Sequence, residues 1–260
     1  MSALRRRPVI HVFEDARTAA LAAGRRVADV LIERQARRMP AVLGLATGAT
    51  MVGVYGELVR MHREDGLSFA HVTGFNLDEY WPMEPENPQS YHRAMAELLW
   101  DHVDVNPSNI HLPDGCVAAA EVDEHCLAYE RAIRRSGPID HFLLGVGRTG
   151  HIGFNEPGSG AGTRTRLVRL DERTREDNAR LGLPGAELPE HAITMGVGTI
   201  LEAGQITLLA LGAHKAEIVS RALEGPVHDD VAASFLQVHD SVTVLLDKEA
   251  ASALSSDSLS

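Results

Sequence analysis

Residues 41–51, Ala-Val-Leu-Gly-Leu-Ala-Thr-Gly-Ala-Thr-Met, form the stretch of sequence that decides the fold. The small and apolar residues 41–45 make a run of the length typical of a buried strand. Thr-Gly-Ala-Thr at 47–50 predicts a tight turn, and apolar residues then recur at helical spacing over residues 51–61. A buried strand, a glycine-containing turn and a helix in this order make up the first part of a βαβ unit.

The same alternation continues on both sides of this stretch. Further strands are expected at residues 9–13, 71–75, 140–144, 206–211 and 242–246. Helices are expected from residue 16 to about 31, and over residues 87–103, 117–135 and 214–223, while residues 163–180 form a charged excursion. Because parallel strands need crossover connections, the alternation predicts a three-layer α/β fold with helices on both faces of a parallel sheet.

Composition is that of a globular enzyme-sized chain. The 260 residues are 44% hydrophobic and 23% charged, and no Ser/Gly/Pro-rich linker divides them. We therefore expect a single domain over residues 1–250, followed by a disordered tail at residues 251–260.

Charge and cysteine content exclude several classes of partner. Acidic residues outnumber basic ones by 36 to 25, which argues against nucleic acid as a partner. No apolar run is long enough for a membrane span, and no signal-peptide pattern follows the N-terminus. Only Cys116 and Cys126 are present, without metal-ligand spacing, so we expect reduced thiols, a cytoplasmic location and neither a disulfide framework nor a Cys-rich zinc site.

Two strand-end loops carry polar groups that suit a ligand. Thr47, Gly48, Ala49 and Thr50 lie before a helix N-terminus, where backbone N–H groups favour phosphate, although an ordinary capped turn would look the same. Residues 78–79, Asp-Glu, follow the strand at 71–75 and suit general acid/base work, but such a pair is also typical of a solvated acidic loop.

The loop at residues 145–157 is the richest in chemistry. It contains Gly-Val-Gly-Arg-Thr-Gly at 145–150, a literal dinucleotide fingerprint, yet the glycines after residue 150 leave no room for the helix that this fingerprint needs. We therefore expect no nucleotide cofactor. His151 and Glu156 remain as an imidazole with a nearby carboxylate that can fix its tautomer.

Several separate strings together resemble the glucosamine-6-phosphate deaminase (isomerase) family, with a similarity that covers almost the whole chain. They occupy residues 43–50, 75–80, 90–91, 147–157, 194–201 and 211–216. The resemblance implies a Rossmann-like fold and the conversion of glucosamine 6-phosphate and water to fructose 6-phosphate and ammonia, without a metal or organic cofactor.

The resemblance also assigns roles to individual residues. Asp78 matches the carboxylate that carries a proton between C2 and C1, and His151 with Glu156 matches the pair that opens the pyranose ring. The expected substrate-binding residues are Thr47, Gly48, Ala49, Thr50, Glu79, Arg180 and Lys215.

Three departures from the family pattern bear on function. Thr149 stands where an aspartate usually joins the histidine and glutamate, so Glu156 alone would supply charge to His151. Ala49 replaces a common glycine. Val168 replaces a basic residue of the activator site found in allosterically regulated members, although Arg166 is kept, so we expect no activation by N-acetylglucosamine 6-phosphate.

Two alternatives stay open. One is an isomerase or lactonase-like hydrolase of another phosphorylated sugar, against which the Phe-Asn-Glu-Pro continuation at 154–157 argues. The other is a non-catalytic sugar-phosphate sensor, for which a DNA-binding segment would be expected before the first strand. The expected partner in every case is a small sugar phosphate, with a homo-oligomer possible.

Overall fold

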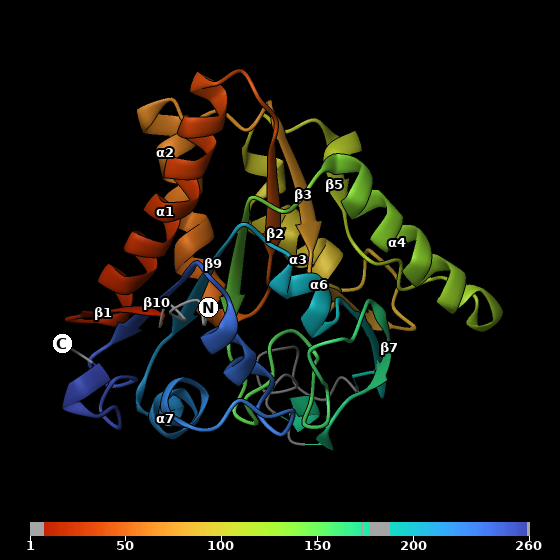
Figure 1. Ribbon diagram of the computed structural model, residues 1–260. Coiled ribbons are helices and arrows are strands. Elements are labelled where there is room, and N and C mark those ends of the chain that lie inside the picture. Colours follow the sequence, from red (N-terminus) through yellow and green to blue (C-terminus); the bar gives the residue numbers. More distant parts are fainter. Residues whose placement is uncertain (1–7, 173, 177–187, 259–260) are drawn as a thin grey trace, which may run out of the picture.

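The computed structural model describes residues 8–172, 174–176 and 188–258. Two sheets organise them (Figure 1). The larger has seven strands, in the order β1-β10-β9-β6-β2-β3-β5, and all of its pairings are parallel. Its strands are β1 (Val9–Phe13), β2 (Ala41–Leu45), β3 (Val72–Asn76), β5 (Ile110–His111), β6 (His141–Gly145), β9 (Gln205–Ala210) and β10 (Val242–Asp247). The predicted parallel α/β fold is confirmed.

Helices cover both faces of this sheet. Figure 1 shows α1 and α2 together on one side and α4 on the other. The α-helices that lie wholly within the described residues are α1 (Ala16–Ala36), α2 (Val52–Asp65), α3 (Tyr91–Leu98), α4 (Val122–Ser136), α6 (Val197–Leu201) and α7 (Ala216–Glu224). Short 3-10 turns precede several of them, including η1 (Ala49–Met51) and η5 (Ala213–Lys215). Burial on both faces explains why β2 and β10 are buried at every position and read as continuous apolar runs.

Local signals set the helix ends. The side chain of Asp15 accepts a hydrogen bond from the Thr18 backbone N–H at 2.7 Å and so caps the start of α1. Gly66 ends α2 with a φ of 75°, in the left-handed region that glycine adopts without strain. These caps fix where each helix meets the sheet.

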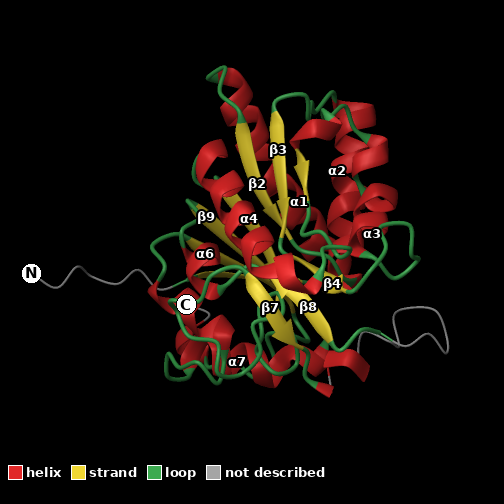
Figure 2. Cartoon of the chain, turned by 90° about the vertical axis from the view of Figure 1, so that its right-hand side faces the viewer, coloured by secondary structure: helices red, strands yellow, loops and turns green. Residues whose placement is uncertain are grey.

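A second, antiparallel sheet was not predicted. It has three strands in the order β4-β8-β7, namely β4 (Asp78–Trp81), β8 (His191–Thr194) and β7 (Arg166–Arg169). Figure 2 shows β7 and β8 side by side outside the main sheet. The expected loop at 78–80 is therefore a strand, and part of the charged excursion at 163–180 is also a strand.

The predicted disorder of the C-terminal tail is wrong for residues 251–258. Ala251 packs into the main core with 6% of its surface exposed. Glu224, in the last turn of α7, accepts hydrogen bonds from the hydroxyls of Ser255 and Ser258, each at 2.6 Å. Hydrogen bonding to a helix end thus orders a segment whose composition suggested disorder.

No helix within the described ranges has the length and apolar character that crossing a bilayer requires.

The strand order creates a natural ligand site between β2 and β6. From β2 the chain continues to β3 and β5 on one side, whereas β6, β9 and β10 build the other side. The loops that leave the carboxyl ends of β2 and β6 therefore diverge, and ligands of open α/β sheets bind in the crevice at such a point.

Candidate active site

A cavity of about 620 Å³ opens at this point, a size that suits a small polar ligand. Its walls come from the loops after β2 and β6, from β4, and from η5 at the start of α7. The lining residues are Ala46, Thr47, Gly48, Ala49, Thr50, Met51, Leu77, Asp78, Tyr91, Gly145, Val146, Gly147, Arg148, His151, Gly153, Phe154, Thr174, Leu211, His214 and Lys215. Most of the site residues expected from the sequence thus meet in one cavity.

The loop after β2 has the geometry of an anion cradle. Gly48 has a φ of 111°, which only glycine adopts readily, and it turns the chain into η1 and α2. Ala49 begins η1, a helical conformation that alanine accepts without cost, so the missing family glycine does not distort the loop. Residues 49–51 of η1 line the cavity and lead into α2, and the unpaired N–H groups of a helix N-terminus favour an anion.

One of the two expected cations lines the cavity. Lys215, the last residue of η5, stands on the wall with His214. Arg180, the other, lies outside the described residues.

Asp78 is the carboxylate of the cavity. It is the first residue of β4 and is 5% exposed, so its carboxyl group is shielded from water while still lining the cavity. Burial, together with the neighbouring Glu79, raises the pKa of Asp78 well above its usual range. A raised pKa makes the ionised carboxylate a stronger base and keeps the carboxyl group protonated up to a higher pH. Both properties suit a group that takes up a proton and gives it back.

Glu79 does not line the cavity, and its prediction as a substrate-binding residue is not supported by its position. Its side chain lies on the opposite face of β4 from that of Asp78, as the side chains of successive strand residues do, and it is 2% exposed. It accepts hydrogen bonds from the Ser90 hydroxyl and from the backbone N–H groups of Tyr80, Tyr91 and His92 at 2.8–3.0 Å. Glu79 therefore holds the N-terminus of α3 against β4.

His151 and Glu156 form the expected pair. Nδ1 of His151 lies 3.1 Å from Oε2 of Glu156, and the two side chains are 16% and 13% exposed. The hydroxyl of Thr149 lies 2.8 Å from the same Nδ1 and donates to the same carboxylate oxygen at 2.9 Å. The other oxygen, Oε1, accepts a hydrogen bond from Thr174 at 2.6 Å.

These contacts keep Glu156 ionised. Burial alone would raise its pKa, but the hydrogen bond and charge of His151 and the hydroxyls of Thr174 and Thr149 outweigh burial and lower it. A carboxylate is therefore available beside His151 although Thr149 brings no charge. Thr174 was missed by sequence reasoning, because it lies 23 positions from His151 with no local motif around it.

Glycine and asparagine shape the loop around His151. A Cβ atom on Gly147 would lie 1.9 Å from Nε2 of His151, so only glycine leaves room for the ring. Asn155 is fully buried, and its amide donates to the carbonyl oxygens of Ile152 and Met195 at 2.8 Å. Its own oxygen accepts from Arg166 at 2.9 Å, which connects the loop to β7.

Two aromatic residues complete the cavity wall and were not predicted to do so. Tyr91 of α3 stacks on Phe154 with ring centroids 6.0 Å apart and planes 11° apart. The Tyr91 hydroxyl lies 3.1 Å from that of Tyr80. Because Glu79 fixes the start of α3, it also fixes where the Tyr91 ring stands.

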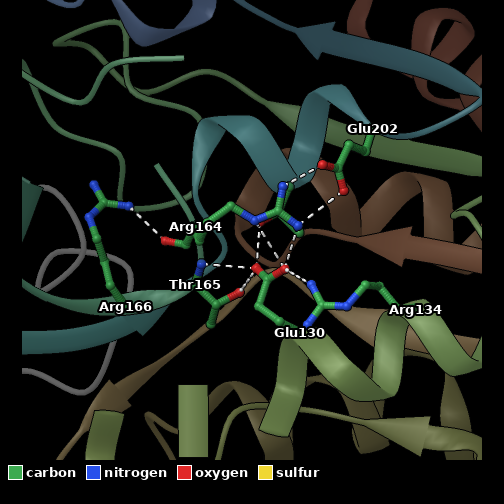
Figure 3. Close-up of polar contacts among 7 residues, drawn as sticks. Glu130, Arg134, Arg164, Thr165, Arg166 and Glu202 are labelled. Carbon is green, nitrogen blue, oxygen red and sulfur yellow. Dashed lines mark hydrogen bonds and ion pairs between the residues drawn. The ribbon is translucent and has the colours of Figure 1, made fainter. Parts of the chain in front are cut away.

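A buried carboxylate anchors the segment that leads into β7. Figure 3 shows Glu130 of α4 surrounded by Arg134, Arg164 and Thr165. Thr165 donates to it through its backbone N–H at 3.0 Å and its hydroxyl at 2.6 Å, and Arg164 pairs with it at 2.5 Å. Burial would raise the pKa of Glu130, but these donors and Thr199 lower it, so the ionised carboxylate holds β7 in place.

The rest of the site offers no nucleotide or metal geometry within the described residues. No helix opens between His151 and Thr165, so the dinucleotide fingerprint lacks its required helix. The group of residues in the described ranges that could hold a metal, His228, Asp229 and Asp230, is outside the cavity lining and largely exposed.

Comparison with known proteins gives consistent matches over most of the chain. Residues 14–245 match the family described as glucosamine-6-phosphate isomerases/6-phosphogluconolactonase. A glucosamine-6-phosphate deaminase of Arthrobacter sp. (strain FB24) is 50% identical over 224 residues, which cover 86% of this chain and 85% of the relative. One of Halothermothrix orenii is 46% identical over 228 residues, or 87% and 94% of the two chains.

Solved structures agree with these matches. A structure described as a monomeric glucosamine-6-phosphate deaminase superposes with a TM-score of 0.88 at 42% identity, covering 94% of this chain and 99% of that one. The 6-phosphogluconolactonase of Trypanosoma brucei superposes with a TM-score of 0.77 at 22% identity, covering 96% and 99%, and so shares the fold.

Proposed function

This chain belongs to the family of glucosamine-6-phosphate isomerases and 6-phosphogluconolactonases, and we propose that it converts glucosamine 6-phosphate and water to fructose 6-phosphate and ammonia. The observation that carries the proposal is the single cavity that joins an anion cradle, a buried carboxylate and a carboxylate-paired imidazole. The term deaminase replaces the broader expectation of a hydrolase/isomerase, because it is the activity named for the relatives at 41–50% identity.

The phosphate occupies the cradle in this proposal. We assign its binding to backbone N–H groups of residues 47–50 and to Lys215, which line the cavity, and Arg180 is the further cation implied by the family resemblance. Anchoring the phosphate places the sugar ring toward Asp78 and His151, because these residues line the same cavity.

Ring opening and proton transfer are divided between two groups. His151 takes the proton of the anomeric hydroxyl and returns one to the ring oxygen as the bond between C1 and that oxygen breaks. Asp78 then removes the proton on C2 and delivers it to C1, while the carbonyl oxygen on C1 gains a proton from the substrate's own ammonium group. This leaves a C1 hydroxyl and a C2 iminium. Water adds to this iminium and ammonia leaves, which gives the ketose.

The lactonase alternative is less well supported. Lactone hydrolysis moves no proton between neighbouring carbons and gives no task to a buried carboxylate such as Asp78. The similarity of this chain to the solved 6-phosphogluconolactonase, at 22% identity, concerns the fold alone. Cytoplasmic location is part of our proposal, consistent with the free thiols of Cys116 and Cys126.

The test is to incubate the protein with glucosamine 6-phosphate and to measure ammonia and fructose 6-phosphate together. We expect equal amounts of both, and a fall of roughly 10²–10⁴-fold in kcat for Asp78→Asn, the range for losing a positioned acid or base. Asp29→Asn, at an exposed position on α1, should stay within about twofold.

Two results would count against the proposal. Saturable binding without either product would leave a sugar-phosphate site but remove the deaminase reaction. Hydrolysis of 6-phosphogluconolactone without release of ammonia from the amino sugar would favour the lactonase alternative.

A further inference from the structure

Glu156 is held at both oxygens by threonines from different parts of the chain. Thr149, in the loop after β6, donates to Oε2 at 2.9 Å, and Thr174, which follows β7, donates to Oε1 at 2.6 Å. Thr174 is 4% exposed, so water does not compete for its hydroxyl. Hydrogen bonds to both oxygens restrict rotation of the carboxylate, and this fixes the orientation of Oε2 toward His151.

Counting protons identifies the tautomer of His151. A threonine hydroxyl has one proton to donate, and both Thr149 and Thr174 give theirs to the carboxylate, which can only accept. Nδ1 of His151 therefore faces three acceptors: Thr149 Oγ1 at 2.8 Å, Glu156 Oε2 at 3.1 Å and Thr174 Oγ1 at 3.5 Å. None of these atoms can give Nδ1 a proton, so Nδ1 must carry its own.

We infer that Thr149 and Thr174 are positioning residues that hold Glu156 and thereby lock His151 as the Nδ1–H tautomer, leaving Nε2 to exchange protons with the substrate. The inference rests on the proposed function for its kinetic consequence. Gly147 makes this placement of the ring possible, because a Cβ atom there would lie 1.9 Å from Nε2, and His151 lines the cavity.

This arrangement explains how the chain can work without the aspartate common in the family. An aspartate at position 149 would place a second negative charge near Glu156, whereas threonine supplies a neutral donor to the carboxylate and a neutral acceptor to the imidazole. Among the described residues, the other titratable or charged groups that line the cavity with His151 are Asp78, Tyr91, Arg148, His214 and Lys215, and these stay the same in all variants below.

The tautomer can be measured without catalysis. Imidazole ¹⁵N shifts and two-bond ¹H–¹⁵N correlations distinguish the two tautomers, and the His151 signals are identified by their loss in His151→Gln. In the unmodified protein, above the pH at which the ring is protonated, we expect an unprotonated Nε2. A protonated Nε2 there would overturn the inference whether or not the protein turns over substrate.

Kinetics test the consequence. The Thr149→Val and Thr174→Val variants should lower kcat roughly 10–100-fold, the cost of losing a hydrogen bond to a charged group, with KM nearly unchanged. Thr149→Ser should restore kcat to within about threefold, because serine keeps the donor. Thr243→Val, at a buried position of β10 outside the cavity lining, controls for the loss of a hydroxyl as such.

Thr149→Asp provides the sharpest comparison. A second carboxylate beside His151 favours the imidazolium, so the acidic limb of the kcat profile should move to higher pH, which a merely structural change would not cause. Full activity of both valine variants, in a protein that deaminates the amino sugar, would refute the inference and leave the proposed function standing. Absence of turnover in the unmodified protein would refute the proposed function, and the ¹⁵N result would still decide the tautomer.

Discussion

Gly147 shows how a missing side chain can determine where the imidazole ring of His151 lies. Any Cβ atom at this position would lie 1.9 Å from Nε2 of His151, far inside contact distance. We expect Gly147→Ala to push the imidazole out of place and to lower kcat about 100-fold or more, since small displacements at a reacting centre cost that much. Steady-state kinetics together with a thermal unfolding curve would separate this effect from misfolding.

The loop offers a matched control for that substitution. A Cβ atom on Gly160 would meet nothing within 4 Å, so Gly160→Ala should retain kcat within about twofold. If Gly147→Ala is as active as Gly160→Ala, the ring position in the structure does not determine catalysis.

Sequence predicted the site residues that sit in recognisable strings and missed those that do not. Asp78, His151 and Glu156 were expected, because glycines and strand ends surround them. Thr174 was missed, since it reaches Glu156 only through the folding of β7 and stands among charged residues. Glu79 was expected beside Asp78 but is outside the cavity lining, because adjacent carboxylates look alike in sequence, while successive residues of a strand point to opposite faces.

At the scale of elements, Glu79 ties β4 to α3. Its carboxylate accepts from the Ser90 hydroxyl and from the backbone N–H groups of Tyr91 and His92. Glu79→Gln replaces an acceptor oxygen with a donor that faces these N–H groups, so we expect a loss of about 2–3 kcal/mol in unfolding free energy. Urea denaturation measures it, and Glu97→Gln, an exposed position on the same helix, should change stability by less than about 0.5 kcal/mol.

Activity should respond to the same change through Tyr91. Because α3 carries this ring into the cavity wall, loosening its N-terminus should raise KM more than it lowers kcat. An unchanged stability for Glu79→Gln would mean that α3 is held by its packing alone.

Six of the seven strands of the main sheet were predicted, whereas β5 and the strands of the small sheet were not. Strands β2, β9 and β10 are buried on both faces and therefore appear as apolar runs. Strand β7, Arg-Leu-Val-Arg, has no buried residue, and β4 begins with two acidic residues. Their pairing with β8 depends on long-range hydrogen bonds that leave no apolar pattern in the chain.

At the scale of the whole molecule, the structure bears on regulation. The guanidinium of Arg166 donates to Asn155 Oδ1 and Ser159 Oγ, each at 2.9 Å, so its donors are used inside the fold. Val168, two positions along β7, offers no charge to an anion. We expect initial rates to be hyperbolic in substrate and unchanged by N-acetylglucosamine 6-phosphate; a severalfold activation would contradict this reasoning.

Stability of the whole fold should depend on pH through one buried histidine. His141 begins β6 in the middle of the main sheet and is 1% exposed, and neither ring nitrogen has a hydrogen-bond partner among the described residues. Burial, aided by the charge of Arg26, lowers the pKa of His141 to about 4. The folded protein therefore holds this ring neutral at pH values where an unfolded chain would protonate it.

The sign of the effect follows from the two protonation equilibria. Above pH ~6.5, the ordinary value for histidine, neither state binds the proton and His141 contributes no pH dependence. As the pH falls from ~6.5 to ~4, the unfolded state gains a proton and the folded state does not, so the free energy of unfolding drops by up to about 3 kcal/mol. Carboxylates also titrate in this range, and the comparison must therefore be made between variants.

His141→Leu isolates the contribution of this ring. Leucine removes the titration and two unpartnered nitrogens, so the variant should lose less stability than the unmodified protein when urea unfolding at pH 7.5 is compared with pH 4.5. His11→Gln, at an exposed position of β1, should leave the original pH dependence in place. If His141→Leu and the unmodified protein lose the same free energy of unfolding between pH 7.5 and pH 4.5, the buried ring does not govern acid stability.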